Sequence, residues 1–371
     1  MTTFSEQGLA ALRQRVQQEI DTGHMGAAQF AIGLDGNVVE FASFGEADED
    51  SRFLIFSATK ALVAMALVPH FADGALDLTT PVAHYLPGFG ENGKADVTVL
   101  QVLTMQGGFP LAPMGPRNWG TSAGRRDKMS QWRLDWKPGS RTEYHPIAAH
   151  WVVAELIEEL SGRPYLEVVH ERIAEPAGVP AVLGPAAAHS PAVTVHAMGE
   201  RGSDEELLAA FGRPDLVPVP GYGPEMLLSM NEPAVQQVGI PGGGAIASAA
   251  TMAAIYQHLL HDPHGVFPRD WRLDAMGTVR NASISVGDGV PANRTIAGYI
   301  AGNDGFQRQR WMPAGAPRAF GHPGAGGQLN WCDPDSGISF SFLHDSLHRC
   351  PAREITRIAD YHRLLMAAVQ R

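Results

Sequence analysis

The chain has 371 residues, of which 44% are hydrophobic and 18% charged, and its formal net charge is −11. This length exceeds the usual size of one hydrophobic core, so we expect two lobes or one domain with a large insertion. The negative charge, without a basic stripe to neutralise phosphates, argues against a nucleic-acid partner. No apolar run approaches the roughly 20 residues that span a bilayer, so we expect no membrane-embedded segment.

Residues 1–23 are expected to form an amphipathic helix. The apolar side chains at helical spacing are Leu9, Leu12, Val16 and Ile20. The segment lacks the basic region, apolar region and cleavage site of a secretory signal. Cys332 and Cys350 are the only cysteines, too few for a disulfide framework. We therefore expect a cytoplasmic protein with reduced thiols.

Strand-like segments occur near both ends of the chain. Residues 27–45 contain two β-like runs joined through Asp35-Gly36, a strong hairpin signal. Strand patterns return from Phe320, with a turn at Asp335-Ser336-Gly337. Helices are expected from about Ser57 to Phe71, between Pro146 and Gly162, within 239–262, and from about Ala352 to Val369.

This order of elements predicts an α+β fold. One antiparallel sheet is built from both chain ends, helices flank it, and a mostly helical domain is inserted. We place the discontinuous sheet domain at 1–75 and 236–371, and the inserted helical domain at 76–235.

Two serines are candidates for a nucleophile. Ser122 lies in "GTSAG", which fits the G-x-S-x-G elbow of one hydrolase class. That elbow needs a strand before the serine and a helix after it. The preceding "LAPMGPRNW" contains two prolines and a glycine, and the following "RRDKMSQW" is charged without an apolar stripe. We therefore interpret Ser122 as part of a surface loop.

Ser57 has a more suitable context. The apolar run "RFLIF" leads into it and a helix follows, so free N–H groups at the helix start would favour an oxyanion. Lys60 lies one turn later on the same face, among apolar neighbours that would lower its pKa toward that of a usable base. Alone, S-x-x-K would more often be a helix cap followed by a lysine extending to solvent.

Other segments favour the interpretation of Ser57 as a nucleophile over that of a helix cap. In chain order they are "SATK", "VTVLQVLTMQGGFP", "PGSRTEYHP", "ELSGRPY", "PGGGAIASAATMAAI" and "FGHPGAGG". Together they resemble the serine β-lactamase and penicillin-binding-protein superfamily, and more narrowly the class C β-lactamase-like esterases called family VIII carboxylesterases. The resemblance implies a β-lactamase-like fold and a hydrolase that works through an acyl-enzyme without a cofactor.

The resemblance also implies roles for single residues. Ser57 matches the nucleophile, Lys60 the lysine of S-x-x-K, and Tyr144 the tyrosine of Y-x-N. Tyr144, beside the Lys60 ammonium, would return the proton to the leaving alcohol and later activate water. The oxyanion hole would use the backbone N–H groups of Ser57 and Ala325. His322-Pro323-Gly324 matches the K-T-G strand, which places His322 and Gly324 against the substrate.

The sequence departs from the family pattern in three places. Y-x-N has become Tyr144-His145-Pro146, which removes an amide, and K-T-G has become H-P-G, which replaces a permanent cation with a mostly neutral histidine. Both changes favour neutral esters over lactams and peptides. The segment that often reads "LLTHTSG" is here "VLTMQGG", from Val102 to Gly108, which we expect to lie away from the site.

The preferred hypothesis is therefore a serine hydrolase that cleaves or transfers ester acyl groups of a small-molecule substrate. A β-lactamase or D-amino-acid amidase of the same fold is the alternative, and a non-catalytic binding protein is a third.

Three tryptophans precede Tyr144 in an irregular region, and we expect an apolar substrate pocket to be lined from among Trp119, Trp132 and Trp136. Trp119 and Trp136 are the substrate-binding candidates. His258, His261 and His264 are spaced poorly for a metal, so no metal site is expected. Oligomeric state is not indicated.

Overall fold

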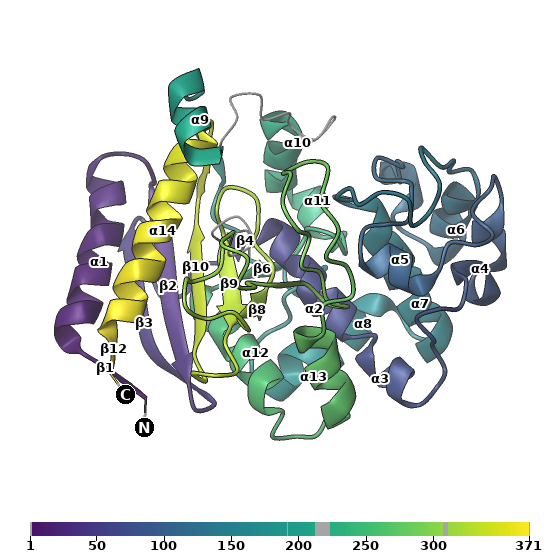
Figure 1. Cartoon of the computed structure of the whole chain (residues 1–371), viewed down its shortest axis with the longest axis horizontal. Helices are drawn as coiled ribbons and strands as arrows, with labels where there is room; N and C mark the ends of the chain where they lie inside the picture. The colour runs from purple at the N-terminus through teal and green to yellow at the C-terminus, as the bar shows by residue number, and fades with distance from the viewer. Residues whose placement is uncertain (1, 191, 212–222, 307–310, 371) are drawn as a thin grey trace.

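The computed structural model describes residues 2–190, 192–211, 223–306 and 311–370. Its central feature is a six-stranded antiparallel sheet in the order β3-β2-β10-β9-β8-β7 (Figure 1). The strands are β2 (Ala27–Leu34), β3 (Asn37–Gly45), β7 (Tyr299–Ile300), β8 (Phe320–Gly321), β9 (Leu329–Cys332) and β10 (Ser339–His344). Because β2 pairs with β10, both chain ends build one sheet, and the predicted α+β architecture is confirmed.

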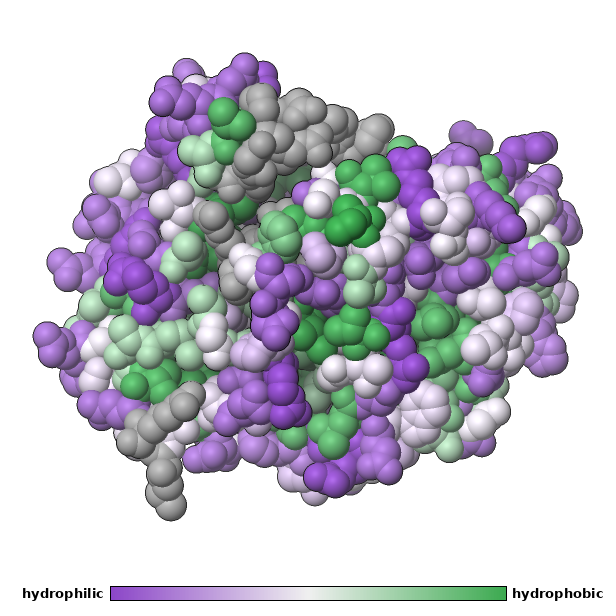
Figure 2. All heavy atoms as spheres, viewed as in Figure 1, coloured by the Kyte–Doolittle hydropathy of each residue, from purple (hydrophilic) through white to green (hydrophobic). Residues whose placement is uncertain are grey.

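Helices cover both faces of the sheet. α1 (Glu6–Asp21) and α14 (Pro351–Ala368) pack together on one face, and α12 (Ala249–His261) packs on the other. β2 serves both cores because its side chains alternate: Phe30 and Ile32 face α1 and α14, whereas Ala31 faces the α12 side. The predicted hairpin is confirmed, with Asp35 and Gly36 at positive φ in its turn. The surface in the same view is mostly polar, with apolar patches across its middle (Figure 2).

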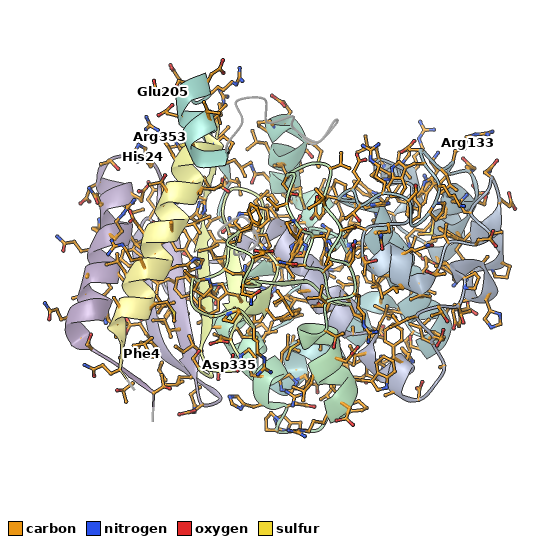
Figure 3. All side chains as sticks on the ribbon, in the orientation of Figure 1. Phe4, His24, Arg133, Glu205, Asp335 and Arg353 are labelled. Atoms are coloured by element: carbon orange, nitrogen blue, oxygen red, sulfur yellow. The ribbon has the colours of Figure 1, made fainter. Side chains whose placement is uncertain are left out.

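Short strand pairs tie the remaining segments to this body. β1 (Thr3–Phe4) pairs with β12 (Val369–Gln370), which places Phe4 beside the end of α14 (Figure 3). β4 (Phe53–Leu54) pairs with β6 (Ile246–Ala247), and β5 (His196–Met198) pairs with β11 (Ser346–His348). β5 lies within residues 76–235, which we assigned to the inserted helical domain, yet it pairs with β11 of the sheet domain. The division into two domains stays a prediction.

The helical part lies on the opposite side of the molecule from α1 (Figure 1). Its helices are α3 (Val68–Ala72), α4 (Val82–Tyr85), α5 (Val99–Leu103), α6 (Ser122–Ser130), α7 (Ala148–Ser161) and α8 (Tyr165–Val169). α10 (Pro224–Leu228) and α11 (Pro233–Gln236) lie nearer the middle of the view, and α9 (Asp204–Phe211) packs against α14. α13 (Arg269–Gly277) follows α12. α7 is the buried centre of this part, and it ends at Gly162 in a left-handed conformation, as predicted. No helix in the described ranges is long and apolar enough to cross a membrane.

The helix expected from Ser57 to Phe71 is broken into pieces. A 3₁₀ turn (Phe56–Ala58) leads into α2 (Thr59–Met65), and α3 begins separately at Val68. Pro69 explains the break, because it lacks the N–H that would bond to the Met65 carbonyl.

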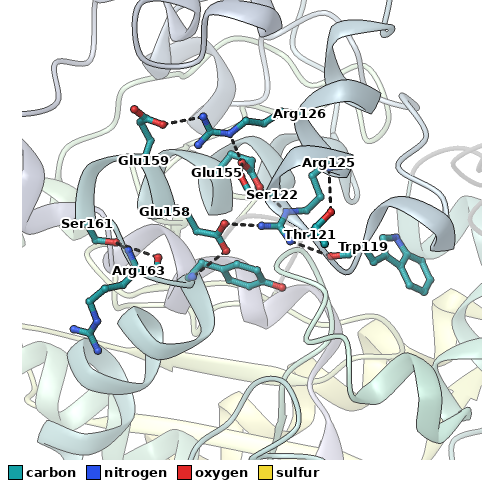
Figure 4. Close-up of polar contacts among 12 residues, drawn as sticks. Trp119, Thr121, Ser122, Arg125, Arg126, Glu155, Glu158, Glu159, Ser161 and Arg163 are labelled. Carbon is teal, nitrogen blue, oxygen red and sulfur yellow. Dashed lines mark hydrogen bonds and ion pairs between the residues drawn. The ribbon is translucent and has the colours of Figure 1, made fainter.

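Ser122 does not lie in a loop, which corrects the expectation from its charged flank. It begins α6, whose cap is Thr121. The charged residues face a buried carboxylate of α7: Glu155 accepts hydrogen bonds from Ser122 Oγ (2.6 Å), Arg125 Nε (2.5 Å) and Arg126 Nε (2.7 Å) (Figure 4). A polar network rather than an apolar stripe therefore holds α6 on α7, which the hydrophobic pattern could not indicate.

Candidate active site

Ser57 lies where the β4–β6 strand pair meets a helix. Phe56, directly before it, has a positive φ of 46°. This conformation is strained for a residue with a Cβ atom, and such strain is typical of functional turns. Lys60 follows on the next helical turn, with its Nζ 3.2 Å from Ser57 Oγ.

Lys60 is enclosed by protein, with 1% of its surface exposed. Its Nζ donates to the carbonyl oxygen of Gly242 at 2.5 Å. Burial lowers the pKa of Lys60 well below that of an exposed lysine, and the positive charge of Arg294 lowers it further. A neutral amine that donates to Gly242 has its lone pair available for the hydroxyl hydrogen of Ser57. The geometry therefore suits proton transfer from Ser57 to Lys60.

Tyr144 is positioned by contacts of its two neighbours. The N–H of Glu143 donates to the Met105 carbonyl oxygen (3.2 Å), and the N–H of His145 donates to Met105 Sδ (3.3 Å). His145 Nε2 accepts from the N–H of Phe109 (3.2 Å), so its Nδ1 carries the proton and donates to the Glu143 carbonyl oxygen (2.7 Å). Burial lowers the pKa of His145 to about 3, which keeps the ring neutral.

Met105 corrects the expectation that the segment from Val102 to Gly108 lies away from the site. Met105 lines the same cavity as Ser57 and Tyr144, and its own φ is +64°. The departure from "LLTHTSG" therefore changes the cavity wall. The segment leaves the end of α5 through Met105, whose positive φ accompanies its position at the same cavity as Ser57 and Tyr144.

The strand motif reaches the same cavity from β8. His322, Gly324 and Ala325 line it together with Ser57 and Tyr144. His322 continues the pairing with β9, and its Nδ1 donates to the Pro323 carbonyl oxygen (2.8 Å). Burial lowers the pKa of His322 well below that of a free imidazole, and the positive charge of Arg294 lowers it further. His322 is therefore neutral, as expected when histidine replaces the lysine of the family pattern.

The cavity has a volume of about 350 Å³, within the range of small-molecule sites. Much of its wall is apolar, supplied by Met105, Pro146, Leu227, Ala292, Trp311 and Pro323. Trp119 and Trp136 are not among its lining residues. Trp119 lines a separate cavity beside Tyr165, and the Trp136 ring packs 5.9 Å from the ring of His145. Trp132 is buried and donates to the Pro113 carbonyl oxygen. Proximity to Tyr144 in sequence did not determine which face these side chains present.

Arg294 is the main functional candidate that sequence reasoning missed. It lines the cavity, is 4% exposed, and its guanidinium carbon lies 5.4 Å from the centre of the Tyr144 ring and 4.0 Å from that of Tyr299. It also donates to the Tyr299 hydroxyl. A permanent cation therefore faces the site although His322 has replaced lysine. No motif surrounds Arg294 in "PANRTIAGY", so the sequence carried no signal for it.

The histidines at the end of α12 and just after it are not arranged as a metal centre. His258 and His264 have ring centres 6.2 Å apart, and His258 Nε2 lies 3.8 Å from the Asp262 carboxylate. Within the described ranges, no group of three or more His, Cys, Asp or Glu side chains is arranged to hold a metal ion.

A sheet built from both chain ends, joined to a helical region beside a cavity that contains Ser57 and Tyr144, defines the β-lactamase-like class of serine hydrolase folds. The family model described as Beta-lactamase matches residues 12–363, so the chain belongs to that family. Among curated proteins, it is 27% identical to Esterase/beta-lactamase LipL of Mycobacterium tuberculosis (strain ATCC 25618 / H37Rv) over 359 residues. The match covers 87% of this chain and 77% of LipL.

Solved structures share the fold over nearly the whole chain. A penicillin-binding protein homolog from Caulobacter crescentus has a TM-score of 0.77 at 22% identity, with 99% of this chain and 100% of that chain covered. A family VIII carboxylesterase has a TM-score of 0.75 at 20% identity, with 98% and 99% covered. The recognised superfamily is thus confirmed, and its members include esterases as well as enzymes of other specificity.

Proposed function

We propose that this chain hydrolyses carboxylic esters, or transfers their acyl groups to another alcohol, through an acyl-enzyme on Ser57. The observation that carries the proposal is the 3.2 Å contact between Ser57 Oγ and a buried Lys60 Nζ at a mostly apolar cavity. The neutral His322 and the missing amide at Pro146 support esters over lactams. The similarity to LipL, whose name includes both esterase and beta-lactamase, supports ester hydrolysis but does not separate esters from lactams.

In the acylation step, Ser57 Oγ attacks the ester carbonyl carbon and its proton passes to the neutral Lys60 amine. The backbone N–H groups of Ser57 and Ala325 stabilise the oxyanion that forms. The tetrahedral intermediate collapses and the carbon–oxygen bond to the alcohol breaks. Tyr144 gives its hydroxyl proton to the leaving oxygen and takes the proton that Lys60 received from Ser57, which leaves Lys60 neutral again. Arg294 stabilises negative charge on Tyr144, because its guanidinium lies over that ring.

In the deacylation step, water or a second alcohol takes the place of the leaving alcohol. Tyr144 and Lys60 remove its proton as it attacks the acyl carbon, and the proton returns to Ser57 as the ester bond to the enzyme breaks. The choice between water and alcohol decides hydrolysis against transfer.

The test compares chromogenic esters of increasing acyl length with a chromogenic lactam, followed by intact-protein mass after brief exposure. We expect ester turnover and one added acyl group in the wild type, and neither in Ser57→Ala. Acylation that persists in Ser57→Ala, or the absence of ester turnover, would overturn the proposal.

Arg294 supports a second candidate, a β-lactamase or a peptidase that acts on D-alanyl peptides. β-Lactams and D-alanyl peptides present a carboxylate, and Arg294 provides a permanent cation at the cavity wall. Two results together would favour this candidate. The wild type would turn over a lactam as fast as an ester, and Arg294→Gln would lose more lactam turnover than ester turnover.

A further inference from the structure

Glu354 is a charged group at the cavity that the proposed mechanism does not use. It lies at the start of α14 and lines the same cavity as Ser57 and Ala325. The side chain is half-buried. Within the described part of the chain, its carboxylate makes no hydrogen bond and no ion pair.

The position of Glu354 relates it to the proposed oxyanion hole. Its Cγ lies 2.8 Å from the point where a Cβ atom on residue 327 would stand, so it packs directly on Gly327. Gly327 follows Ala325 and Gly326 in the loop after β8. Arg357, one helical turn later, does not pair with Glu354. Its Nη2 donates to the Gly326 carbonyl oxygen (3.1 Å), and its Nη1 lies 3.9 Å from the Glu19 carboxylate.

The helix start alone does not account for this arrangement. A glutamate in the first turn stabilises a helix by about 0.3–1 kcal/mol through the helix dipole, and it does so while fully exposed. Here the carboxyl is instead turned into a cavity, where lost hydration raises its pKa to about 7 despite the opposing charge of Arg357. A partly desolvated carboxylate without a partner gains most from a cation.

The other described charged groups that line the cavity do not pair with the Glu354 carboxylate. Arg294 lies against Tyr144 and Tyr299 on a different wall, and Asp288 is a second acid on the lining. Gly326 and Glu354 line the cavity, whereas Gly327 and Arg357 are not among its described lining residues. The Glu354 carboxylate on this wall would attract an ammonium and repel a carboxylate.

We infer that Glu354 is a specificity-determining residue that binds an ammonium group of the substrate, so that amine-bearing esters are preferred over neutral esters of the same shape. The inference rests on the proposed ester hydrolysis and names its substrate class.

The experiment compares pairs of esters that differ only in charge. In one pair the alcohol is choline or its uncharged carbon isostere, 3,3-dimethylbutanol. In the other, the acyl chain ends in trimethylammonium or in tert-butyl. At a pH of about 8, above the pKa of Glu354, we expect the wild type to favour the charged member of at least one pair about tenfold in kcat/KM, about 1.4 kcal/mol.

The variants separate charge recognition from general damage. Glu354→Gln should bring the ratio for that pair close to one, mainly through a higher KM for the charged ester, while Glu354→Asp should retain part of the preference. Glu205→Gln is the matched control. It removes the same charge, but from the outer end of α9, away from the cavity (Figure 3). It should keep the wild-type ratio.

Two results would overturn the inference: a wild type without preference in either pair, or a preference that survives in Glu354→Gln. If neutral esters are hydrolysed through Ser57 in these cases, the proposed function stands and only the role of Glu354 falls. If no ester of any charge is hydrolysed, both fall.

Discussion

The carbonyl oxygen of Ile55 lies 2.3 Å from the point where a Cβ atom on residue 324 would stand, so glycine is required at that position. Ile55 is two residues before Ser57, and Gly324 is directly before Ala325. The close approach therefore joins the turn of the proposed nucleophile to the loop that would supply the second oxyanion donor. The third residue of the H-P-G motif has a steric reason to be glycine.

Gly324→Ala should lower kcat/KM for esters at least a hundredfold, about 2.7 kcal/mol of transition-state stabilisation. The added methyl group would also meet Gln328 Cβ at 2.8 Å, so the loop after β8 must move away from Ser57. Steady-state kinetics measure the loss, and circular dichroism checks that the fold is retained.

Gly277→Ala is the matched control for this substitution. Gly277 ends α13, and nothing lies within 4 Å of the place its Cβ atom would occupy. This variant should keep wild-type turnover. Equal activities of the two variants would show that the contact between Ile55 and Gly324 does not set the oxyanion geometry.

Ser57→Ala should lower ester turnover at least a thousandfold, about 4 kcal/mol, because the hydroxyl beside Lys60 is the proposed nucleophile. Ser122→Ala should affect stability instead. It removes one donor from the buried Glu155 carboxylate and is expected to cost about 1–3 kcal/mol of unfolding free energy, with kcat/KM nearly unchanged. Denaturant titration and ester kinetics on both variants measure the contrast. An active Ser57→Ala enzyme would end the proposed mechanism.

Much of the fold could be predicted because local signals determine its elements. Asp35-Gly36 favours the hairpin turn, Gly162 ends α7, and the spacing of Leu9, Leu12 and Val16 indicates the buried face of α1. The order of strands and helices then leaves few ways to close a sheet from both chain ends.

Other parts depend on contacts that no local pattern contains. Arg294 reaches Tyr144 because the segment after α13 folds back, pairing residue 281 with 294, and a lone arginine gives no signal of this. Glu354 reads as an ordinary first-turn glutamate until α14 is packed beside Gly327. The prediction that Trp119 and Trp136 line the substrate pocket is wrong for the same reason, because tertiary packing determines where a loop side chain points.

The stability of the protein should fall on acidification from about pH 6.5, because buried histidines stay neutral in the folded chain. His145 illustrates the sign. Its folded pKa is about 3, whereas an exposed histidine has a pKa near 6.5, so between these values only the unfolded chain binds the proton. Each such group lowers the unfolding free energy by up to about 1.4 kcal/mol per pH unit as pH falls. Burial also lowers the pKa of His150, His322 and His344.

Urea titrations at several pH values between about 7 and 5 measure this slope. His145→Gln should be less stable at neutral pH, because it loses the bond from Phe109, but its dependence on pH should be shallower than that of the wild type. His189→Gln, at an exposed position, should keep the wild-type slope. An unchanged slope in His145→Gln would show that this ring is protonated in the folded state.

The pH dependence of turnover should reveal the influence of Arg294 on Lys60. The neutral Lys60 amine is the proposed base, so kcat/KM should rise as pH increases through the pKa of Lys60. Burial is the larger cause of the lowered pKa, and the charge of Arg294 is the second. Arg294→Gln removes that charge, which raises the pKa of Lys60 and moves the rising limb of the profile to higher pH.

Arg294→Lys separates charge from shape at this position. It keeps a cation near Tyr144 but loses the planar group that lies 4.0 Å from the centre of the Tyr299 ring, so we expect lower turnover with the rising limb close to that of the wild type. Profiles of kcat/KM against pH for all three proteins, on one neutral ester, decide the question. A uniform loss at every pH in Arg294→Gln, without displacement of the limb, would mean that Arg294 only shapes the cavity and does not set the protonation of Lys60.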